Sequence, residues 1–293
     1  MSDFVDPEIA SQPDCWRRVA GLTDAMAALP IAGQRVAVVG CGTSWFMGMA
    51  YAGLREAAGH GWTDALAASE FPVGRSYDVV VAISRSGTTT EVADLLRTLK
   101  PQTRKVAIVG VADTPVARAA DEVIVLDFAD ERSVVQTRYA TTALALLRAQ
   151  LGADIERIAD DAHRALLLEL PEGAVAADQI TFLGAGWTVG LAQEAALKVR
   201  EASQGWAEAY PAMDYRHGPI AVAAAGRVVW AFGAVPAGLR TDVLATGAEW
   251  IPGTGLDPLA ELILAQRVAV ARARRLGLDP DRPRNLTRSV VLR

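Results

Sequence analysis

Short apolar runs that alternate with helix-length stretches constrain the fold of this chain more than any other feature. Four such runs occupy 35–39, 78–83, 105–109 and 122–126, and each is the length of a strand. Strands that are apolar on both faces and separated by helices are typical of a parallel sheet covered by helices on both sides. The pattern therefore predicts an α/β fold whose ligands bind at the carboxyl ends of the strands.

The pattern starts again in the second half of the chain. The stretch Val-Ala-Val-Val-Gly-Cys-Gly-Thr-Ser at 36–44 is matched by Ile-Thr-Phe-Leu-Gly-Ala-Gly-Trp-Thr at 180–188. A strand, a Gly-x-Gly turn and a hydroxyl residue that recur after about half the chain predict an internal repeat. We expect an N-terminal helical segment at 1–30, a first domain at 31–170 and a second domain at 171–293 that has lost one βα unit.

Composition and charge exclude several classes of protein. With 51% hydrophobic and 22% charged residues, the chain has the composition of an ordinary globular protein. The net charge of −5 argues against sequence-independent nucleic-acid binding, which needs many Lys and Arg residues. Two cysteines and three scattered histidines supply neither a disulfide framework nor a metal-ligand set. The N-terminus does not resemble a secretory signal, and no apolar run is long enough for a membrane span. We therefore expect a cytoplasmic protein with no metal, no cofactor, no nucleic-acid partner and no membrane association.

A loop rich in hydroxyl residues follows the strand expected at 78–83. It reads Ser-Arg-Ser-Gly-Thr-Thr-Thr-Glu at 84–91 and leads into a helix expected at 92–99. A helix start offers unpaired N–H groups and the positive end of the helix dipole, so backbone donors and hydroxyls can hold a phosphate there without lysine or magnesium. Gly87 lets the backbone approach a ligand closely. One hydroxyl residue would be enough to cap the helix, so the loop favours phosphate binding over capping alone.

Two features of the second half carry groups able to transfer protons. Glu194, Lys198 and Glu201 have the i, i+4, i+7 spacing that places three residues on one face of a helix, and taken alone this spacing favours an exposed ladder of ion pairs. His217 precedes Gly-Pro, which indicates a loop. Histidine titrates near neutrality and suits proton transfer, although a single histidine is more often structural or incidental.

Together these pieces resemble the sugar isomerase (SIS) domain family, and within it the isomerase half of glucosamine-6-phosphate synthase. The resemblance runs from about Val36 to the end and rests on five motifs in order: Cys41-Gly-Thr-Ser44, Ser84-Arg-Ser-Gly87, the helix face Glu194 to Glu201, His217-Gly-Pro219, and the tail 282–290. It implies two tandem SIS domains, each a parallel sheet flanked by helices in the flavodoxin-like manner, the second of them shortened.

The resemblance also implies roles for individual residues. Glu201 would be the base that moves a proton between C1 and C2 of the sugar, with Lys198 and Arg288 in the catalytic set. His217 would assist ring opening from the partner subunit, which implies a homodimer. The implied ligand-binding residues are Cys41, Gly42, Thr43, Ser44, Ser84, Arg85, Ser86, Gly87 and Thr89 around the phosphate, and Val134, Gln136 and Thr137 along the sugar.

Three departures from the synthase bear on the reaction. Arg288 stands where the synthase has a tail lysine, and arginine stays protonated and cannot form an imine. Arg85 and Gln136 replace a Gln and a Ser near the ligand, so the sugar can differ. The glutaminase half of the synthase has no counterpart in this sequence, and we expect no glutamine-dependent synthesis from this chain alone.

The function expected from these features is that of an isomerase or deaminase for an amino-sugar or ketose 6-phosphate, of the glucosamine-6-phosphate or fructose-6-phosphate type. Two alternatives stay open: a phosphosugar sensor without turnover, and a deglycase for phosphorylated fructosamines. We expect phosphate binding in the first domain only, because the second copy has the apolar stretch Ala231-Phe-Gly-Ala234 where the first has Ser84-Arg-Ser-Gly87.

Overall fold

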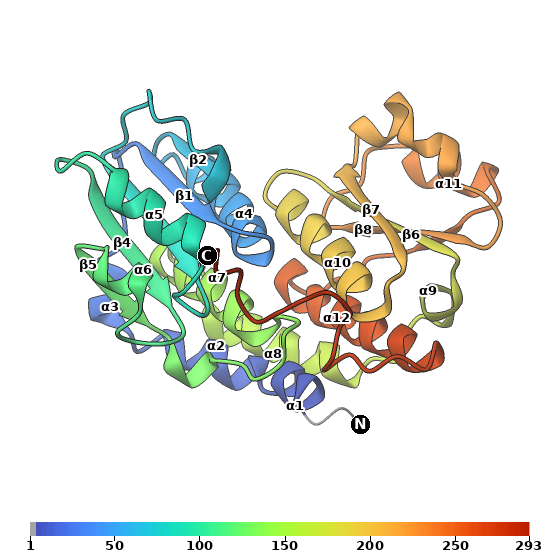
Figure 1. Ribbon diagram of the computed structural model, residues 1–293. Helices are drawn as coiled ribbons and strands as arrows, with labels where there is room; N and C mark the ends of the chain where they lie inside the picture. The colour runs from blue at the N-terminus through green and yellow to red at the C-terminus, as the bar shows by residue number, and fades with distance from the viewer. Residues whose placement is uncertain (1–3, 293) are drawn as a thin grey trace. The chain divides into compact units, whose positions relative to one another are not determined.

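The computed structural model describes residues 4–292, which group into two compact units (Figure 1). The first-sheet unit consists of residues 11–132, 136–156 and 287–292, and the second-sheet unit of residues 4–10, 133–135 and 157–286. Each unit is built around one parallel sheet. The expected α/β architecture with parallel sheets flanked by helices is therefore present.

The first-sheet unit contains a five-stranded sheet in the order β2-β1-β3-β4-β5. Strands β1 and β3 lie at its centre and are buried along their whole length, as their continuous apolar runs require. The elements of this unit are α2 (Gln12–Val19), α3 (Thr23–Ala27), β1 (Val36–Gly40), α4 (Thr43–Ala57), β2 (Thr63–Ala67), η1 (Ala68–Glu70), β3 (Val79–Ser84), α5 (Thr90–Thr98), β4 (Arg104–Val109), α6 (Pro115–Arg118), β5 (Glu122–Val125), η2 (Asp127–Ala129) and α7 (Arg138–Gln150).

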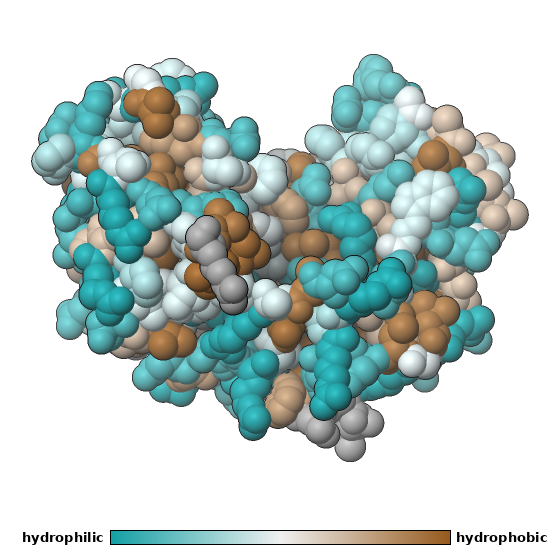
Figure 2. Space-filling model, in the orientation of Figure 1, coloured by the Kyte–Doolittle hydropathy of each residue, from teal (hydrophilic) through white to brown (hydrophobic). Residues whose placement is uncertain are grey.

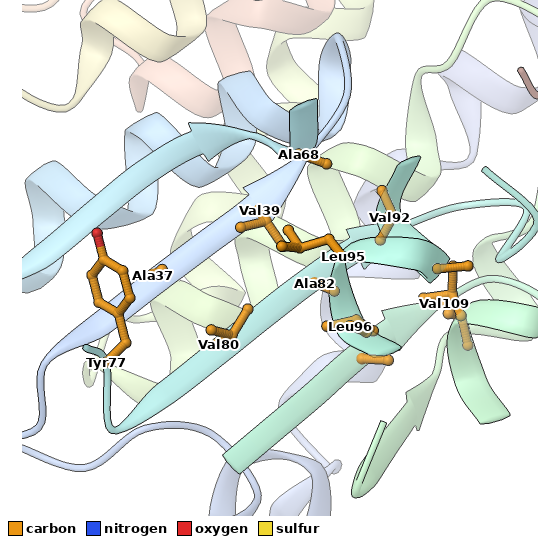
Figure 3. Close-up of a cluster of buried hydrophobic side chains, with 13 residues drawn as sticks. Ala37, Val39, Ala68, Tyr77, Val80, Ala82, Val92, Leu95, Leu96 and Val109 are labelled. Atoms are coloured by element: carbon orange, nitrogen blue, oxygen red, sulfur yellow. The ribbon is translucent and has the colours of Figure 1, made fainter. Parts of the chain in front are cut away.

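Small and β-branched side chains form the core on one face of this sheet. Figure 3 shows Val92, Leu95 and Leu96 of α5 against the strands, where Val80 and Ala82 of β3 meet them. The stripe at i, i+3, i+4 on α5 explains why this short helix docks in one orientation. Because α5 is held along its length, its first turn has a fixed position at the end of β3.

The second-sheet unit contains a four-stranded sheet in the order β7-β6-β8-β9. This order repeats that of the first sheet without its fifth strand, and the expected shortening is therefore found. That the two units are tandem copies of one domain stays a prediction. The elements are α1 (Val5–Ala10), most of α8 (Ile155–Leu167), α9 (Glu172–Ala176), β6 (Gln179–Gly184), α10 (Thr188–Ser203), β7 (Trp206–Pro211), η3 (Asp214–His217), η4 (Pro219–Val222), β8 (Arg227–Phe232), α11 (Leu239–Ala245), β9 (Glu249–Ile251) and α12 (Pro258–Arg275).

Two strands were not expected from the sequence. Strand β2 reads Thr-Asp-Ala-Leu-Ala and is only partly buried, so it lacks the apolar run that marks its neighbours. Strand β7 carries the charged Glu208 and the aromatic Tyr210, which interrupt the apolar run that would mark it as a strand. Both strands lie at the edges of their sheets, where one side of the strand has no neighbour and polar residues are tolerated.

The limits of the two units differ from the continuous ranges expected at 31–170 and 171–293. Most of α8 groups with the second sheet, and the tail 287–292 groups with the first sheet. Figure 1 shows this tail, in dark red, ending beside α5. The domain limits themselves stay a prediction, but the position of the tail matters for the site below.

The visible surface intermingles hydrophilic and hydrophobic residues (Figure 2). Among the helices described between residues 4 and 292, none combines the length and the apolarity needed to cross a membrane. Within the same residues, no cluster of three or more His, Cys, Asp or Glu side chains is arranged to hold a metal ion.

Candidate functional site

The loop after β3 leads into the start of α5 and carries two buried serines. Ser84 ends β3, and Thr89 is the N-cap residue of α5. Ser84 and Ser86 are 4% and 9% exposed, so their hydroxyls lie within the fold. The Oγ of Ser86 accepts hydrogen bonds from the N and Oγ1 of Thr88, at 3.2 and 3.1 Å. The Oγ of Ser84 has no hydrogen-bond partner among residues 4–292, and a buried hydroxyl in that state is suited to a ligand oxygen.

Gly87 is required in this loop for two reasons. Its φ of +63° lies in the left-handed region, and a Cβ would lie 2.0 Å from the Oγ1 of Thr114. Thr114 in turn accepts a hydrogen bond from Ala117 N at the start of α6. Any side chain at 87 would therefore displace Thr114 and the start of α6. Only glycine permits a loop this narrow.

The first Gly-x-Gly turn lies beside this loop, because both follow the carboxyl ends of neighbouring parallel strands. Strands β1 and β3 are parallel neighbours, so Thr43 and Ser44 at the start of α4 emerge beside the loop 84–89. Both side chains are buried. Gly42 has a φ of +53°, and a Cβ on Gly40 would meet Ser44 Cβ at 2.7 Å. The turn thus brings its hydroxyls close to the backbone of β1.

Cys41 joins the two turns. Its Sγ donates to Glu91 Oε2 at 3.5 Å, in the first turn of α5. Burial, and then the neighbouring Glu91 carboxylate, raise the pKa of the Cys41 thiol to about 12. The thiol is therefore protonated at neutral pH and acts as a hydrogen-bond donor, and it is a poor nucleophile.

The segment expected along the sugar falls in two units. Gln136 and Thr137 belong to the first-sheet unit, and Val134 belongs to the second-sheet unit. Thr137 is buried, and its N and Oγ1 each donate to Glu131 Oε1 at 2.7 Å. The Oε1 of Gln136 is buried without a hydrogen-bond partner among the described residues.

The helix face of α10 is buried, so an exposed ladder of ion pairs is the wrong interpretation. The side chains of Glu194 and Lys198 are each 1% exposed, and that of Glu201 is 20% exposed. Lys198 Nζ lies 3.3 Å from Glu194 Oε1 and also contacts Glu201 Oε2. Burial lowers the pKa of Lys198, but the carboxylates of Glu194 and Glu201 outweigh burial and hold the pKa above its usual value. Lys198 is therefore held as a cation. Of the two carboxylates beside it, only that of Glu201 is partly exposed.

The remaining two residues of the expected catalytic set lie in different units. His217 ends the short helix η3 and is exposed, in the second-sheet unit. Arg288 lies in the tail of the first-sheet unit, where its guanidinium donates to Asp130 Oδ1 at 2.5 Å and to the Glu131 carbonyl. The loops 41–44 and 84–89 and the tail are therefore brought together within one unit, whereas Glu194, Lys198, Glu201 and His217 belong to the other.

In the second sheet, the segment that corresponds to the loop 84–87 lies two residues later in the chain than the sequence predicts. Val39 pairs with Ala82, so Gly40 is level with Ile83, whereas Gly184 pairs with Phe232. The segment that corresponds to 84–87 is therefore 233–236, Gly-Ala-Val-Pro, and not 231–234. Because this segment also has no hydroxyl side chain, the reason for expecting phosphate binding only at the first sheet is unchanged.

Two acidic residues near the tail were not found from the sequence. Asp130 and Glu131 contact Arg288, which is separated from them by 158 and 157 residues. Glu131 also faces Arg85, with 3.9 Å between Oε2 and the Arg85 Nη1. No local motif marks either carboxylate, because the partners in these pairs are far apart in the chain and meet only in the folded first-sheet unit.

Comparison with known proteins identifies proteins that are similar to this chain in sequence. Residues 32–151 match the model of the SIS domain. Glutamine-fructose-6-phosphate aminotransferase (isomerizing) from Caulobacter vibrioides is 30% identical over an alignment that covers 99% of this chain and 59% of that protein. The corresponding protein from Sulfurisphaera tokodaii is 28% identical, with 88% of this chain and 50% of that protein covered. The chain thus spans about half to three fifths of the length of these curated relatives.

Solved structures share the fold across nearly the whole chain. Glucosamine-6-phosphate deaminase from Thermotoga maritima superposes with a TM-score of 0.84 at 23% identity, covering 98% of this chain and 99% of that one. Tagatose-6-phosphate ketose/aldose isomerase from Escherichia coli superposes with a TM-score of 0.78 at 20% identity, covering 98% and 96%. At these identities the likeness concerns the fold.

Proposed function

Because residues 32–151 of this chain belong to the SIS domain family, we propose that it is an enzyme that isomerises or deaminates an amino-sugar or ketose 6-phosphate. The observation that carries the proposal is the loop 84–89, in which buried serines meet the start of α5 and the Oγ of Ser84 has no partner among residues 4–292. Such a site binds a dianionic phosphate through hydroxyl and backbone donors.

The phosphate donors in this proposal are the hydroxyls of Ser44, Ser84, Ser86 and Thr89, helped by Thr43 and by main-chain N–H groups. Cys41, Gly42 and Gly87 shape the two turns that present these donors. Val134, Gln136 and Thr137 would lie along the sugar. Names of related proteins support the ligand class, since glucosamine-6-phosphate deaminase and tagatose-6-phosphate isomerase share the fold.

Glu201 is the proposed general base, which takes a proton from one of C1 and C2 and returns it to the other. Its carboxylate is partly exposed and contacts the Lys198 ammonium, which supports this role because a general base has to be both accessible to the substrate and held in position. Lys198, held between two carboxylates, orients Glu201. His217 is the proposed group for opening the sugar ring.

Substitution of Glu201 tests the enzyme proposal. A positioned general base contributes about 10²–10⁴-fold in rate, so Glu201→Gln should reduce solvent-deuterium exchange at C1 or C2 of glucosamine 6-phosphate or fructose 6-phosphate by that factor. Phosphate affinity should stay nearly unchanged, because binding does not need the base. Glu172→Gln, at an exposed position on α9, is the matched control. Equal exchange in wild type and Glu201→Gln would contradict the role of Glu201.

A phosphosugar sensor without turnover is the second candidate, and Arg288 favours it. An imine-forming lysine in the tail would supply an amine, whereas the Arg288 guanidinium is held by Asp130 and cannot act as one. Complete absence of exchange with every sugar phosphate that raises the melting temperature would support the sensor. Release of ammonia from glucosamine 6-phosphate would separate deamination from isomerisation, and release of an amine from a phosphorylated fructosamine would identify a deglycase.

A further inference from the structure

Four charged side chains of the first-sheet unit form a connected cluster at the phosphate loop. Arg85 follows Ser84 directly, yet its side chain is only 1% exposed and faces the wholly buried side chain of Glu131. Its Nη1 lies 3.9 Å from Glu131 Oε2, and its Nη2 donates to the main-chain carbonyl of Arg288 at 3.0 Å. With Asp130 and Arg288 the cluster contains two cations and two anions, and we call it the arginine clasp.

The carboxylate of Glu131 is held by three hydrogen bonds that do not involve Arg85. Its Oε1 accepts hydrogen bonds from Thr137 N, Thr137 Oγ1 and Arg138 N, at 2.7, 2.7 and 2.8 Å. These donors lie at the start of α7, so the carboxylate satisfies the unpaired groups of a helix N-terminus. A carboxylate held in this way gives Arg85 a rigid partner, and the pairing reduces the cost of burying the guanidinium.

The clasp holds the tail by its main chain and by a side chain. The carbonyl of Arg288 accepts from Arg85, while the guanidinium of Arg288 reaches Asp130 and the carbonyl of Glu131. Beyond this point the tail follows the start of α5. The hydroxyls of Thr88 and Ser289 are hydrogen-bonded, with 2.9 Å between their oxygens. Thr90 N donates to the Val290 carbonyl at 3.2 Å, and Leu292 N donates to Thr90 Oγ1 at 2.9 Å.

We propose that Arg85 is a positioning residue that fixes the C-terminal tail against the loop 84–89, and that Arg288 serves as a structural anchor of that tail. The forked guanidinium of Arg85 spans Glu131 and the tail carbonyl at once, which a lysine ammonium on a single stem does less well. Resting on the proposed function, the tail would also respond to phosphate, because it contacts Thr88, whose hydroxyl is linked to Ser86.

Hydrogen exchange of two amides tests the clasp without any ligand. Thr90 N–H and Leu292 N–H are protected only while the tail lies on α5. In Arg85→Lys and Arg288→Ala, protection of both amides should fall by about tenfold or more, as expected when a hydrogen bond from a charged group is lost. Arg75→Lys and Arg282→Ala are matched controls, since both arginines have mostly exposed side chains outside the clasp. They should leave protection unchanged.

The Arg288→Ala variant keeps this test decisive if Arg85→Lys folds poorly, because the Arg288 side chain is 35% exposed and outside the core. Wild-type protection at both amides in Arg288→Ala would overturn the anchor. Wild-type protection in a folded Arg85→Lys, or an equal loss in Arg75→Lys, would overturn the positioning role of Arg85.

A second measurement addresses the response to phosphate. Inorganic phosphate, and fructose 6-phosphate in a parallel titration, should increase protection at Thr90 and Leu292 in wild type and should do so less in Arg85→Lys. Bound ligand with unchanged protection in wild type would overturn the response. If neither ligand binds wild type, the proposed function fails, while the ligand-free exchange experiment still decides the clasp.

Discussion

Ser84 and Ser86 occupy different positions within one loop. Ser84 Oγ has no partner within residues 4–292, whereas Ser86 Oγ accepts from Thr88 and can donate its own hydrogen to a ligand. Ser86→Ala should therefore weaken sugar-phosphate binding by roughly 1.5–3 kcal/mol, the contribution of a hydrogen bond to a charged group. Isothermal titration calorimetry with fructose 6-phosphate measures the change.

Ser76→Ala is the control for that experiment, because Ser76 is exposed and lies before β3, at the opposite end of the strand. It should bind like wild type. Equal affinities in Ser86→Ala and wild type would remove Ser86 from the site.

Cys41 gives a second prediction at the scale of the residue. Since burial and Glu91 raise its pKa to about 12, the thiolate at pH 8 should be roughly a hundredfold to a thousandfold scarcer than for an ordinary cysteine. Alkylation by iodoacetamide, followed by mass spectrometry, should be correspondingly slow. Glu91→Gln removes the neighbouring charge, lowers the pKa of Cys41 and should accelerate its labelling. Cys15 is also buried but is not affected by Glu91, so its labelling rate serves as the internal reference. Rapid wild-type labelling of Cys41 would contradict the assigned environment.

At the scale of the element, α12 carries a buried carboxyl group in its first turn. Glu261 is 2% exposed and accepts a hydrogen bond from Trp230 Nε1 at 3.1 Å. Burial raises its pKa to about 7, although the bonds from Trp230 and from the backbone near Thr254 act in the opposite direction. The folded state therefore binds this proton more tightly than the unfolded state does. Its contribution to stability is complete below the unfolded pKa, near 4.5, and is lost as pH rises through about 7.

Glu261→Gln should remove this pH dependence. Between pH 4.5 and pH 7.5 the free energy of unfolding of wild type should fall relative to the variant by roughly 3 kcal/mol, because each pKa unit corresponds to about 1.4 kcal/mol. Chemical denaturation across this pH range measures the difference. Glu169→Gln, at an exposed position, should follow wild type. Parallel pH profiles for wild type and Glu261→Gln would contradict the raised pKa.

At the scale of the whole molecule, the proposed role of His217 predicts a homodimer whose sites each combine residues of two subunits. Sedimentation velocity at micromolar concentration should show a dimer. In a two-fold assembly, mixing His217→Ala with Glu201→Gln should restore exchange activity to about a quarter of wild type, because half of the molecules are mixed dimers with one intact site each. A monomer, or no recovery after subunit exchange is demonstrated, would contradict the shared site.

Much of the fold could be predicted from the sequence, because local patterns determine it. Apolar runs of strand length predicted β1, β3, β4 and β5, the internal repeat predicted β6, and all five are confirmed. The edge strands β2 and β7 were missed because polar residues interrupt their apolar pattern. The resemblance to the SIS family rests on short motifs at the ends of strands, and residues 32–151 match the model of the SIS domain. Such motifs can be recognised in the sequence because the residues of the proposed anion-binding turn and its glycines are consecutive in the chain.

Tertiary structure alone decided which charged groups meet. The spacing of Glu194, Lys198 and Glu201 predicted a common helix face but could not tell a solvated face from a buried one, since burial depends on what packs against α10. Likewise, Arg85 and Arg288 lie within the loop and tail motifs, whereas their partners Asp130 and Glu131 belong to no motif. The sequence by itself determined the local turns and the family; the pairing of charges far apart in the chain was decided by packing, because Coulomb interactions and desolvation depend on distance in space.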